Sequence, residues 1–413
     1  MTEAGTSVPQ RLRSVFRHGG FARYMTGEAV SMTGTWMQVM AQGWVMTSLT
    51  SSAVLLGMVH FAAGIPMLAL TLVGGVVADR WDRRSVLLVT QVVQIALALW
   101  LGAQVATARI QVWQIIAVAF VLGISASFEM PAASALVPEL VPPGEVAAAI
   151  AVDRSVFHGT RLIGPALGGY VIGLWGTAAA FYLNALSFVA LILALFTLRA
   201  RTRGSPEEEA QRRSGMKEGL RYVRSDAPTV AMIALMAAST LFVFPVMAVM
   251  LPLYARQVLG LGPDKMGLLM GISSLGSLTG SVGLLAVPRH RRRPLMAVAV
   301  GIVGAALTSL GLARVFAVAA ASLVALTLGV STLIGLANTI VQERAPGALR
   351  GRVSAVAGLS FFGLMPFASL GITSVADAIG LRAALLLAAV LYLVTAALVL
   401  ARAGREPGAT GSA

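Results

Sequence analysis

The chain has 413 residues, of which 57% are hydrophobic and 12% are charged. Soluble domains have about a quarter charged residues, so this composition excludes a soluble enzyme and indicates a protein that crosses a membrane several times. The formal net charge of +14 would suggest a nucleic-acid partner in a soluble chain. Here the basic residues stand in short segments between apolar runs, which the positive-inside bias explains, so no nucleic-acid partner is expected.

Twelve apolar segments have the length that crossing a bilayer requires, about twenty residues. Their even number predicts that both chain termini lie on the same side of the membrane. In chain order the predicted spans are residues 22–47, 53–78, 85–107, 111–137, 146–174, 177–198, 228–254, 265–287, 294–313, 315–342, 352–376 and 382–401.

The basic residues orient these spans. Twenty-four of the 31 lie on one side, and five lie on the other, namely Arg109, Arg256, Lys265, Arg314 and Arg382. Because short cytoplasmic loops are rich in arginine and lysine, both termini are predicted to be cytoplasmic. Arginine outnumbers lysine 29 to 2, which is typical of a GC-rich bacterial genome and indicates a bacterial inner (plasma) membrane.

A long polar segment divides six spans from six. The predicted organisation is a cytoplasmic tail (1–21), an N-terminal six-helix bundle (22–198), a cytoplasmic central loop (199–227), a C-terminal six-helix bundle (228–401) and a second cytoplasmic tail (402–413). In the central loop Met216, Leu220 and Val223 recur at helical spacing. This spacing predicts a short helix that either lies on the inner membrane surface or is a solvated lead into the seventh span.

The two halves repeat each other. Residues 137–142 are echoed by residues 341–346, 204 positions later, and the arginines at 80, 83 and 84 are echoed by those at 289, 292 and 293. Pro288 takes the place of Asp79, so only the first half has this acid. Repeated halves with a pocket between them are typical of transporters. The predicted fold class is an all-α integral membrane protein with twelve transmembrane helices in two pseudo-symmetric six-helix bundles.

The loop between the second and third spans carries two acids and three arginines within residues 79–84. Charges at this density do not stay in hydrocarbon, so the loop is predicted to be a turn at the membrane surface. It resembles the signature G-x-L-A-D-R-x-G-R-R of the major facilitator superfamily, with Val77 in place of Leu and Asp82 in place of Gly. The matching residues are Gly75, Ala78, Asp79, Arg80, Arg83 and Arg84.

This resemblance implies a gating loop. Asp79 would face the start of the eleventh span near Arg352, where the helix dipole and the guanidinium both favour an anion. Such a contact would join the two bundles on the cytoplasmic side. The alternative is that these charges only set the topology.

The fifth span contains the sequence Gly164-Pro165-Ala166-Leu167-Gly168-Gly169. It resembles the G-P-x-x-G-G signature of proton-driven drug exporters of this superfamily, and it predicts a helix that bends at Pro165. The alternative is a packing seam of small residues.

Other motifs resemble the enterobactin-exporter-like and macrolide-efflux-like branch, among them Gly34-Thr35-Trp36-Met37-Gln38 and Gly351-Arg352-Val353. The resemblance implies a monomeric transporter in contact with membrane lipid that exports a small, fairly apolar organic compound in exchange for protons, by alternating access. A facilitator or importer on the same fold is the alternative. A membrane enzyme or receptor is disfavoured, since the sequence has no G-x-x-x-x-G-K-[ST] or H-E-x-x-H motif.

Ionisable groups inside a span cost several kcal/mol unless they are paired or wetted, so each one is a functional candidate. The proton-coupling candidates, all in the first half, are Glu28, Glu129, Asp153, Arg154 and Arg161. We expect the three acids to share a polar region and Asp153 and Glu129 to exchange a proton, with Arg161 acting through its charge. The alternative is a permanent acid–arginine pair that holds helices together.

Aromatic and methionine side chains suit variable apolar substrates. The candidates for a substrate cavity are Trp36, Met37, Met40, Phe61, Phe242, Phe244, Met247 and Phe361. No cofactor or metal is expected, because the chain has no cysteine and neither His60 nor His158 has a second ligand at metal spacing.

Overall fold

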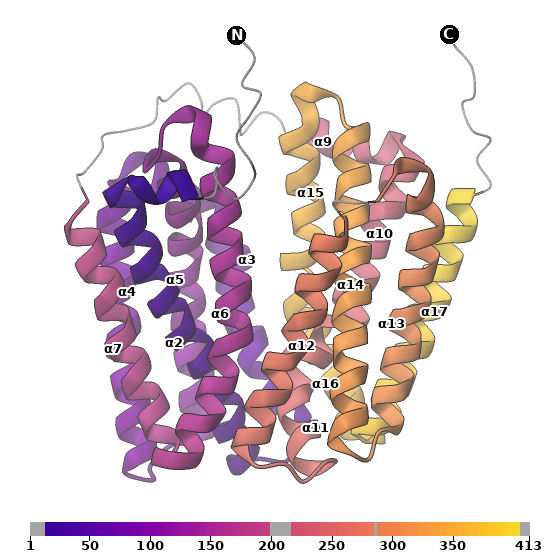
Figure 1. Cartoon of the computed structure of the whole chain (residues 1–413). Coiled ribbons are helices and arrows are strands. Elements are labelled where there is room, and N and C mark those ends of the chain that lie inside the picture. Colours follow the sequence, from indigo (N-terminus) through magenta and orange to yellow (C-terminus); the bar gives the residue numbers. More distant parts are fainter. Residues whose placement is uncertain (1–12, 199–215, 285–286, 405–413) are drawn as a thin grey trace. The chain divides into compact units, whose positions relative to one another are not determined.

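The computed structural model describes residues 13–198, 216–284 and 287–404, and the regular structure of these residues is entirely helical (Figure 1). Each of the twelve predicted spans is occupied there by one helix or by consecutive helical segments. Ten of these segments are long and apolar enough to cross a membrane. The other two, α2 (Gly19–Leu49) and α6 (Val146–Trp175), are as long but carry more polar residues. The predicted all-α membrane architecture is confirmed.

Residue contacts divide the chain into two compact units, each of which is described by itself. Unit 1 holds the described residues of Met1–Ser51, Ala62–Pro206 and Gly260–Gly271. Besides α2 and α6, its elements are η1 (Val15–Arg17), α3 (Ala53–Arg80) from Ala62 onward, α4 (Arg83–Ala106), α5 (Val112–Glu139), η2 (Pro143–Glu145), α7 (Thr177–Phe196) and the first turns of α12 (Pro263–Gly283).

Unit 2 holds the described residues of Ser52–Phe61, Glu207–Leu259 and Ile272–Ala413. It therefore includes the first turns of α3 and the later part of α12. Its other elements are α9 (Met216–Ser225), α10 (Ala227–Phe242), η3 (Val246–Met250), α11 (Leu251–Gln257), η5 (Arg289–Arg291), α13 (Arg292–Leu312), α14 (Phe316–Arg344), η6 (Gly347–Leu349), α15 (Arg350–Phe362), α16 (Met365–Ile379) and α17 (Leu381–Gly404).

In unit 1 the contact between α3 and α5 depends on glycine. A Cβ atom on Gly74 would stand 1.9 Å from the carbonyl oxygen of Ser127, and one on Gly123 would stand 2.1 Å from that of Ala63. Both distances are far below van der Waals contact, so only glycine lets these backbones approach so closely. Ser127 Oγ also donates a hydrogen bond to the Pro66 carbonyl oxygen at 3.2 Å. This packing positions the end of α3 that leads into the charged loop.

Two predicted spans of unit 2 are interrupted. The seventh is formed by α10, the π-helical turn η3 and α11, and the eleventh is formed by α15 and α16. The interruptions stand next to Pro245 and Pro366. Proline has no amide hydrogen and clashes with the preceding turn, which favours a break at these two positions, although α6 continues through Pro165. The sequence pattern predicted a single helix at both places, because apolar content alone does not show such breaks.

Candidate functional site

The carboxyl group of Glu129 on α5 is held by two amide side chains of α4. Its Oε1 accepts a hydrogen bond from Gln91 Nε2 at 2.7 Å, and its Oε2 accepts one from Gln94 Nε2 at 2.6 Å. Gln91 Oε1 accepts a long hydrogen bond from Ser31 Oγ on α2, at 3.5 Å. Gln91 and Gln94 stand three positions apart, so both lie on one face of α4. Neither glutamine was among the residues predicted from the sequence, although an amide pair at i and i+3 in an apolar span marks them.

Two further acids of unit 1 lie near Glu129. Glu28 on α2 is within electrostatic range of both Glu129 and Asp153, and the buried Tyr24 is within range of all three carboxyl groups. Neither Glu28 nor Asp153 forms a hydrogen bond or salt bridge with another described residue. Arg154 acts on Asp153 through its charge while its side chain is exposed. Helices α2, α5 and α6 thus bring the three acids into one region, which we call the acid cluster (Glu28, Glu129 and Asp153).

Arg161 lies on the same helix as Asp153 but makes an aromatic contact. Its guanidinium carbon stands 5.4 Å from the ring centroid of Trp36, whose ring meets Phe157 edge-on at 5.9 Å. Trp36 Nε1 is buried and has no hydrogen-bond partner among the described residues. The permanent acid–arginine pair stays an alternative prediction for these residues.

The glycine-proline stretch of α6, residues 164–169, packs closely against two other helices of unit 1. A Cβ atom on Gly169 would stand 2.4 Å from the carbonyl oxygen of Pro263, and one on Gly267 would stand 2.3 Å from that of Pro165. Helix α6 continues through Pro165 to Trp175. These contacts fit a packing seam, and a role of this stretch in helix bending stays a prediction. On the α2 side, Gly164 and Gly168 approach Trp36 and Met37 in the same way.

The arginines that follow α3 fasten helices within unit 1. Arg83 forms an ion pair with Glu139 at the end of α5, and its Nη1 also donates to the Ala135 carbonyl oxygen at 3.1 Å. Arg84 Nη1 donates to the Leu198 carbonyl oxygen at 3.0 Å, beyond the end of α7. These two side chains therefore hold α4 against α5 and α7. The sequence motif did not indicate these partners.

The rest of the predicted gating loop is only partly described. Gly75, Asp79 and Arg80 form the last turns of α3, and Arg80 is exposed. The side chain of Asp79 lies outside the described residues. Asp82 caps α4, since its Oδ2 accepts hydrogen bonds from the Ser85 amide at 3.2 Å and from Ser85 Oγ at 2.8 Å. The contact of Asp79 with the start of the eleventh span stays a prediction.

Arg352, the predicted partner of Asp79, has another acid beside it in unit 2. It forms an ion pair with Glu218 of α9, and a Cβ atom on Gly219 would stand 2.9 Å from the Cβ of Arg352. The start of α15 is therefore bound closely to α9. Glu218 was missed as a candidate because it belongs to the charged central loop, where an acid alone carries no specific signal.

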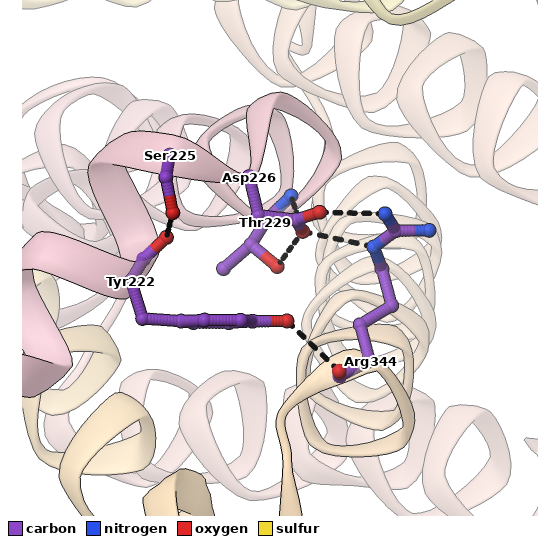
Figure 2. Close-up of polar contacts among 5 residues, drawn as sticks. All are labelled: Tyr222, Ser225, Asp226, Thr229 and Arg344. Carbon is purple, nitrogen blue, oxygen red and sulfur yellow. Dashed lines mark hydrogen bonds and ion pairs between the residues drawn. The ribbon is translucent and has the colours of Figure 1, made fainter.

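A second group of contacts binds the end of α9 to the end of α14 (Figure 2). Arg344 donates from Nε to Asp226 Oδ2 at 2.9 Å and from Nη2 to Oδ1 at 2.6 Å, and Tyr222 donates to the Arg344 carbonyl oxygen at 2.8 Å. Thr229 donates from its amide to Asp226 Oδ2 at 3.1 Å. The hydrogen bonds from Arg344 lower the pKa of the Asp226 carboxyl group to about 2, against the opposing effect of burial. With the Glu218 pair, this network attaches α9 to unit 2 at both ends.

The ion pair of Arg83 has a counterpart in unit 2. Arg292, at the start of α13, donates to Glu343 near the end of α14 at 2.7 Å, and Arg289 stands 3.6 Å from the same carboxyl group. In the sequence repeat, Arg292 takes the position equivalent to Arg83, and Glu343 takes the position equivalent to Glu139. Each unit therefore joins equivalent helices with equivalent charges.

Asp377 of α16 caps the first turn of α3 within unit 2. It accepts hydrogen bonds from Ser52 Oγ at 2.5 Å, from the Ala53 amide at 2.5 Å and from the Val54 amide at 3.2 Å. An acid at this position satisfies free amide groups and complements the helix dipole. Because α3 continues into unit 1 from Ala62, this capping contact holds a helix that both units share.

The predicted cavity residues have different surroundings. In unit 1 Met37 and Met40 are buried in the core. In unit 2 Phe61 meets Phe367 edge-on at 5.7 Å and Phe244 meets Phe361 edge-on at 4.7 Å. Met247 is buried in η3, and Phe242 ends α10 half-buried. Their role in a substrate cavity stays a prediction. No group of three or more metal-ligating side chains occurs within the described ranges.

Comparisons with known proteins agree with this architecture. The model of the family described as "Transmembrane secretion effector" matches residues 13–409. The multidrug efflux pump Tap of Mycolicibacterium fortuitum is 26% identical, and the alignment covers 86% of this chain and 88% of that protein. The macrolide efflux protein A of Streptococcus pyogenes is 23% identical over 88% of this chain and 90% of that protein.

A third relative, the uncharacterized MFS-type transporter YfiS of Bacillus subtilis (strain 168), is 26% identical; this alignment covers 63% of the chain and 62% of that protein. Among solved structures, a bacterial homolog of the human lysosomal transporter Spinster, in an inward-facing and unoccupied conformation, superposes with a TM-score of 0.75. It is 15% identical, and 94% of this chain and 97% of that chain are covered. The predicted transporter fold is confirmed.

Proposed function

Because the chain belongs to the transmembrane secretion effector family of the major facilitator superfamily, we propose that it exports a small, fairly apolar organic compound in exchange for protons. The two named efflux relatives support the direction of transport. The excess of basic residues on one side supports an orientation in the bacterial inner membrane with both termini in the cytoplasm.

The observation that carries the proposal is the acid cluster of unit 1. Glu28 is within electrostatic range of both Glu129 and Asp153. Neighbouring carboxylates are costly to ionise together, so we propose that this cluster takes up and releases protons. Glu129 is held in place by Gln91 and Gln94, whereas Glu28 and Asp153 have no hydrogen bond to another described residue. We assign Glu129 as the fixed member and Asp153 as the exchanging member.

We propose that Arg161 and Arg154 act on this site through their charge. Arg154 acts on Asp153 through its charge, and its side chain is exposed. A cation at a distance favours loss of the proton without trapping the carboxylate in a permanent pair. The contact of Arg161 with Trp36 holds its guanidinium in place.

The test is proton movement in proteoliposomes that contain the purified protein. Addition of a transported compound should release protons from the wild type, and Asp153→Asn or Glu129→Gln should reduce this release at least tenfold. Glu145→Gln is the matched control, because Glu145 is an acid of unit 1 that pairs with His18 outside the cluster. If both cluster variants keep wild-type coupling, the assignment is wrong.

The substrate class and the direction need a separate measurement. Cells that express the protein should accumulate less of a transported dye or macrolide, and an uncoupler should restore its accumulation. An increased uptake that survives the uncoupler would instead indicate a facilitator or importer. A panel of antibiotics, dyes and siderophores distinguishes the apolar compounds proposed here from polar ones.

The gating loop enters the proposal through its resemblance to the superfamily signature. We propose that Arg352 at the start of α15 changes partner between two conformations. In one conformation it contacts Asp79, and in the other it pairs with Glu218, as it does in this structure. Asp79→Asn should then lower export while the amount of protein in the membrane stays unchanged. Accessibility labelling that shows the same balance of conformations in Asp79→Asn and in the wild type would contradict this role.

A further inference from the structure

Unit 2 has a groove on its surface between α13, the start of α14 and α17. Its volume is about 780 Å³. The floor is formed by small residues of α13, namely Gly301, Gly304, Ala305 and Thr308, and Leu393 of α17 forms one wall. These positions recur every three or four residues, so they share one face of the helix.

The lining of the groove is apolar. Thr308 Oγ1 donates to the Gly304 carbonyl oxygen at 2.9 Å, and Ser309 Oγ accepts from Ser322 Oγ at 2.8 Å. Both hydroxyl groups therefore already have a hydrogen-bond partner inside the unit. Residues 301 to 312 rise by about 1.5 Å each, which gives a groove of roughly 16 Å. One half of a bilayer's hydrocarbon core measures about 15 Å.

One end of the groove carries a cation. Arg314 lies in the connection between α13 and α14, lines the groove and is exposed. Within the described part of the chain it has no hydrogen-bond or salt-bridge partner. An apolar channel of one leaflet's depth that ends at an unpaired guanidinium is complementary to a lipid, with an acyl chain along the helix and a phosphate at the arginine.

We propose that this groove binds one acyl chain of an anionic phospholipid and that Arg314 binds its headgroup phosphate. Unit 1 offers the contrast. Its connection between α4 and α5 has the equivalent exposed arginine, Arg109, but the last two turns of α4 carry the large exposed side chains Leu99 and Trp100 in place of small residues. The equivalent end of unit 1 thus has the cation without the small-residue floor.

The test is lipid binding to the purified full-length protein in detergent, measured by native mass spectrometry with phosphatidylglycerol and phosphatidylcholine as probes. The wild type should retain phosphatidylglycerol in preference to phosphatidylcholine. Arg314→Gln should reduce this preference about fivefold, which corresponds to ~1 kcal/mol for one basic residue at an anionic surface. Arg109→Gln is the matched control and should leave the preference unchanged.

A second variant tests the groove itself. A Cβ atom on Gly301 meets no atom within 4 Å, so Gly301→Leu should fold normally while its side chain fills the channel. It should reduce retention of both lipids and should lower the thermal stabilisation that added phosphatidylglycerol gives. Equal retention by wild type and Gly301→Leu, or an equal loss in Arg109→Gln, would overturn the proposal. So would a dimer of the wild type that Gly301→Leu dissociates, because the occupant would then be a second copy of the chain.

Discussion

The two units join equivalent helices with the same kind of ion pair, but they differ inside their spans. Arg83 pairs with Glu139 in unit 1, and Arg292 pairs with Glu343 in unit 2. Only unit 1 has acids along its spans, where Glu28, Glu129 and Asp153 lie in one region. In the described part of unit 2 the acids lie at helix ends, namely Glu218, Asp226, Glu343 and Asp377.

The comparison separates two uses of charge in one fold. Charges that the repeat retains at helix ends hold neighbouring helices together and are present twice. Charges that one unit alone carries inside its spans are expensive to place there and do not repeat, which indicates a task that needs only one site. In this protein we propose that the task is proton exchange.

The largest expected effect concerns the acids that unit 2 lacks. Glu129→Gln and Asp153→Asn should each reduce proton-coupled export at least tenfold, whereas Glu343→Gln, at a helix end of unit 2, should leave coupling intact because Glu343 binds only arginines at that end. Counterflow of a labelled substrate without a proton gradient should persist in the first two variants. Loss of coupling in Glu343→Gln would remove the distinction between the units.

The repeated ion pairs should not contribute equally. Arg83 also donates to the carbonyl oxygens of Ala78 and Ala135, whereas Arg292 donates to Glu343 alone in the described chain. Arg83→Gln removes the ion pair with Glu139 and two hydrogen bonds to carbonyl oxygens, and it should cost about 2 kcal/mol of unfolding free energy. Arg292→Gln should cost less. Thermal unfolding in detergent measures both, and an equal loss of Tm would contradict the ranking.

Two helix caps provide a test of α3, the helix that has residues in both units. Asp377→Ala removes the cap of α3 and Asp82→Ala removes the cap of α4, and each should cost about 1 kcal/mol. Only the Asp377 contact holds a helix that begins in unit 2 and continues in unit 1. Accessibility labelling should therefore shift in Asp377→Ala and stay at the wild-type pattern in Asp82→Ala. A shift of equal size in both variants would show that the cap has no special role.

The smallest effect is the pH dependence of the α9 attachment. The pKa of Asp226 is lowered to about 2 in the folded protein, against about 3.9 for an unfolded aspartate. The stabilisation is therefore complete above pH of about 4 and is lost as the pH falls towards about 2. Because the Arg344 side chain is 44% exposed, screening by water limits this stabilisation to about 1 kcal/mol.

The measurement is the midpoint of unfolding between these pH values in wild type and Asp226→Asn. The midpoint of the wild type should fall further with acid than that of the variant. Parallel curves would show that the ion pair contributes nothing to stability. Arg344→Gln should behave as Asp226→Asn does, because either change removes the same contact.

Much of the architecture followed from the sequence alone. The twelve spans, the all-α fold and the correspondence of Arg83 and Glu139 with Arg292 and Glu343 are visible in the order of apolar and charged residues. Apolar length and clustered charge decide whether a segment enters a bilayer, so the spans can be predicted without knowledge of tertiary contacts. The presence of Glu28, Glu129 and Asp153 inside spans was predictable for the same reason.

Only the tertiary structure decided which side chains meet. It placed Gln91 and Gln94 on Glu129, Glu218 on Arg352, and Asp377 on the start of α3, which is 324 positions away at Ala53. A span that is apolar on every face has no periodicity that reveals its inward side, and a hydrogen bond between distant residues leaves no local pattern. Helix packing set these contacts, because close approach at glycines such as Gly74 and Gly123 fixes how each helix is rotated against its neighbour.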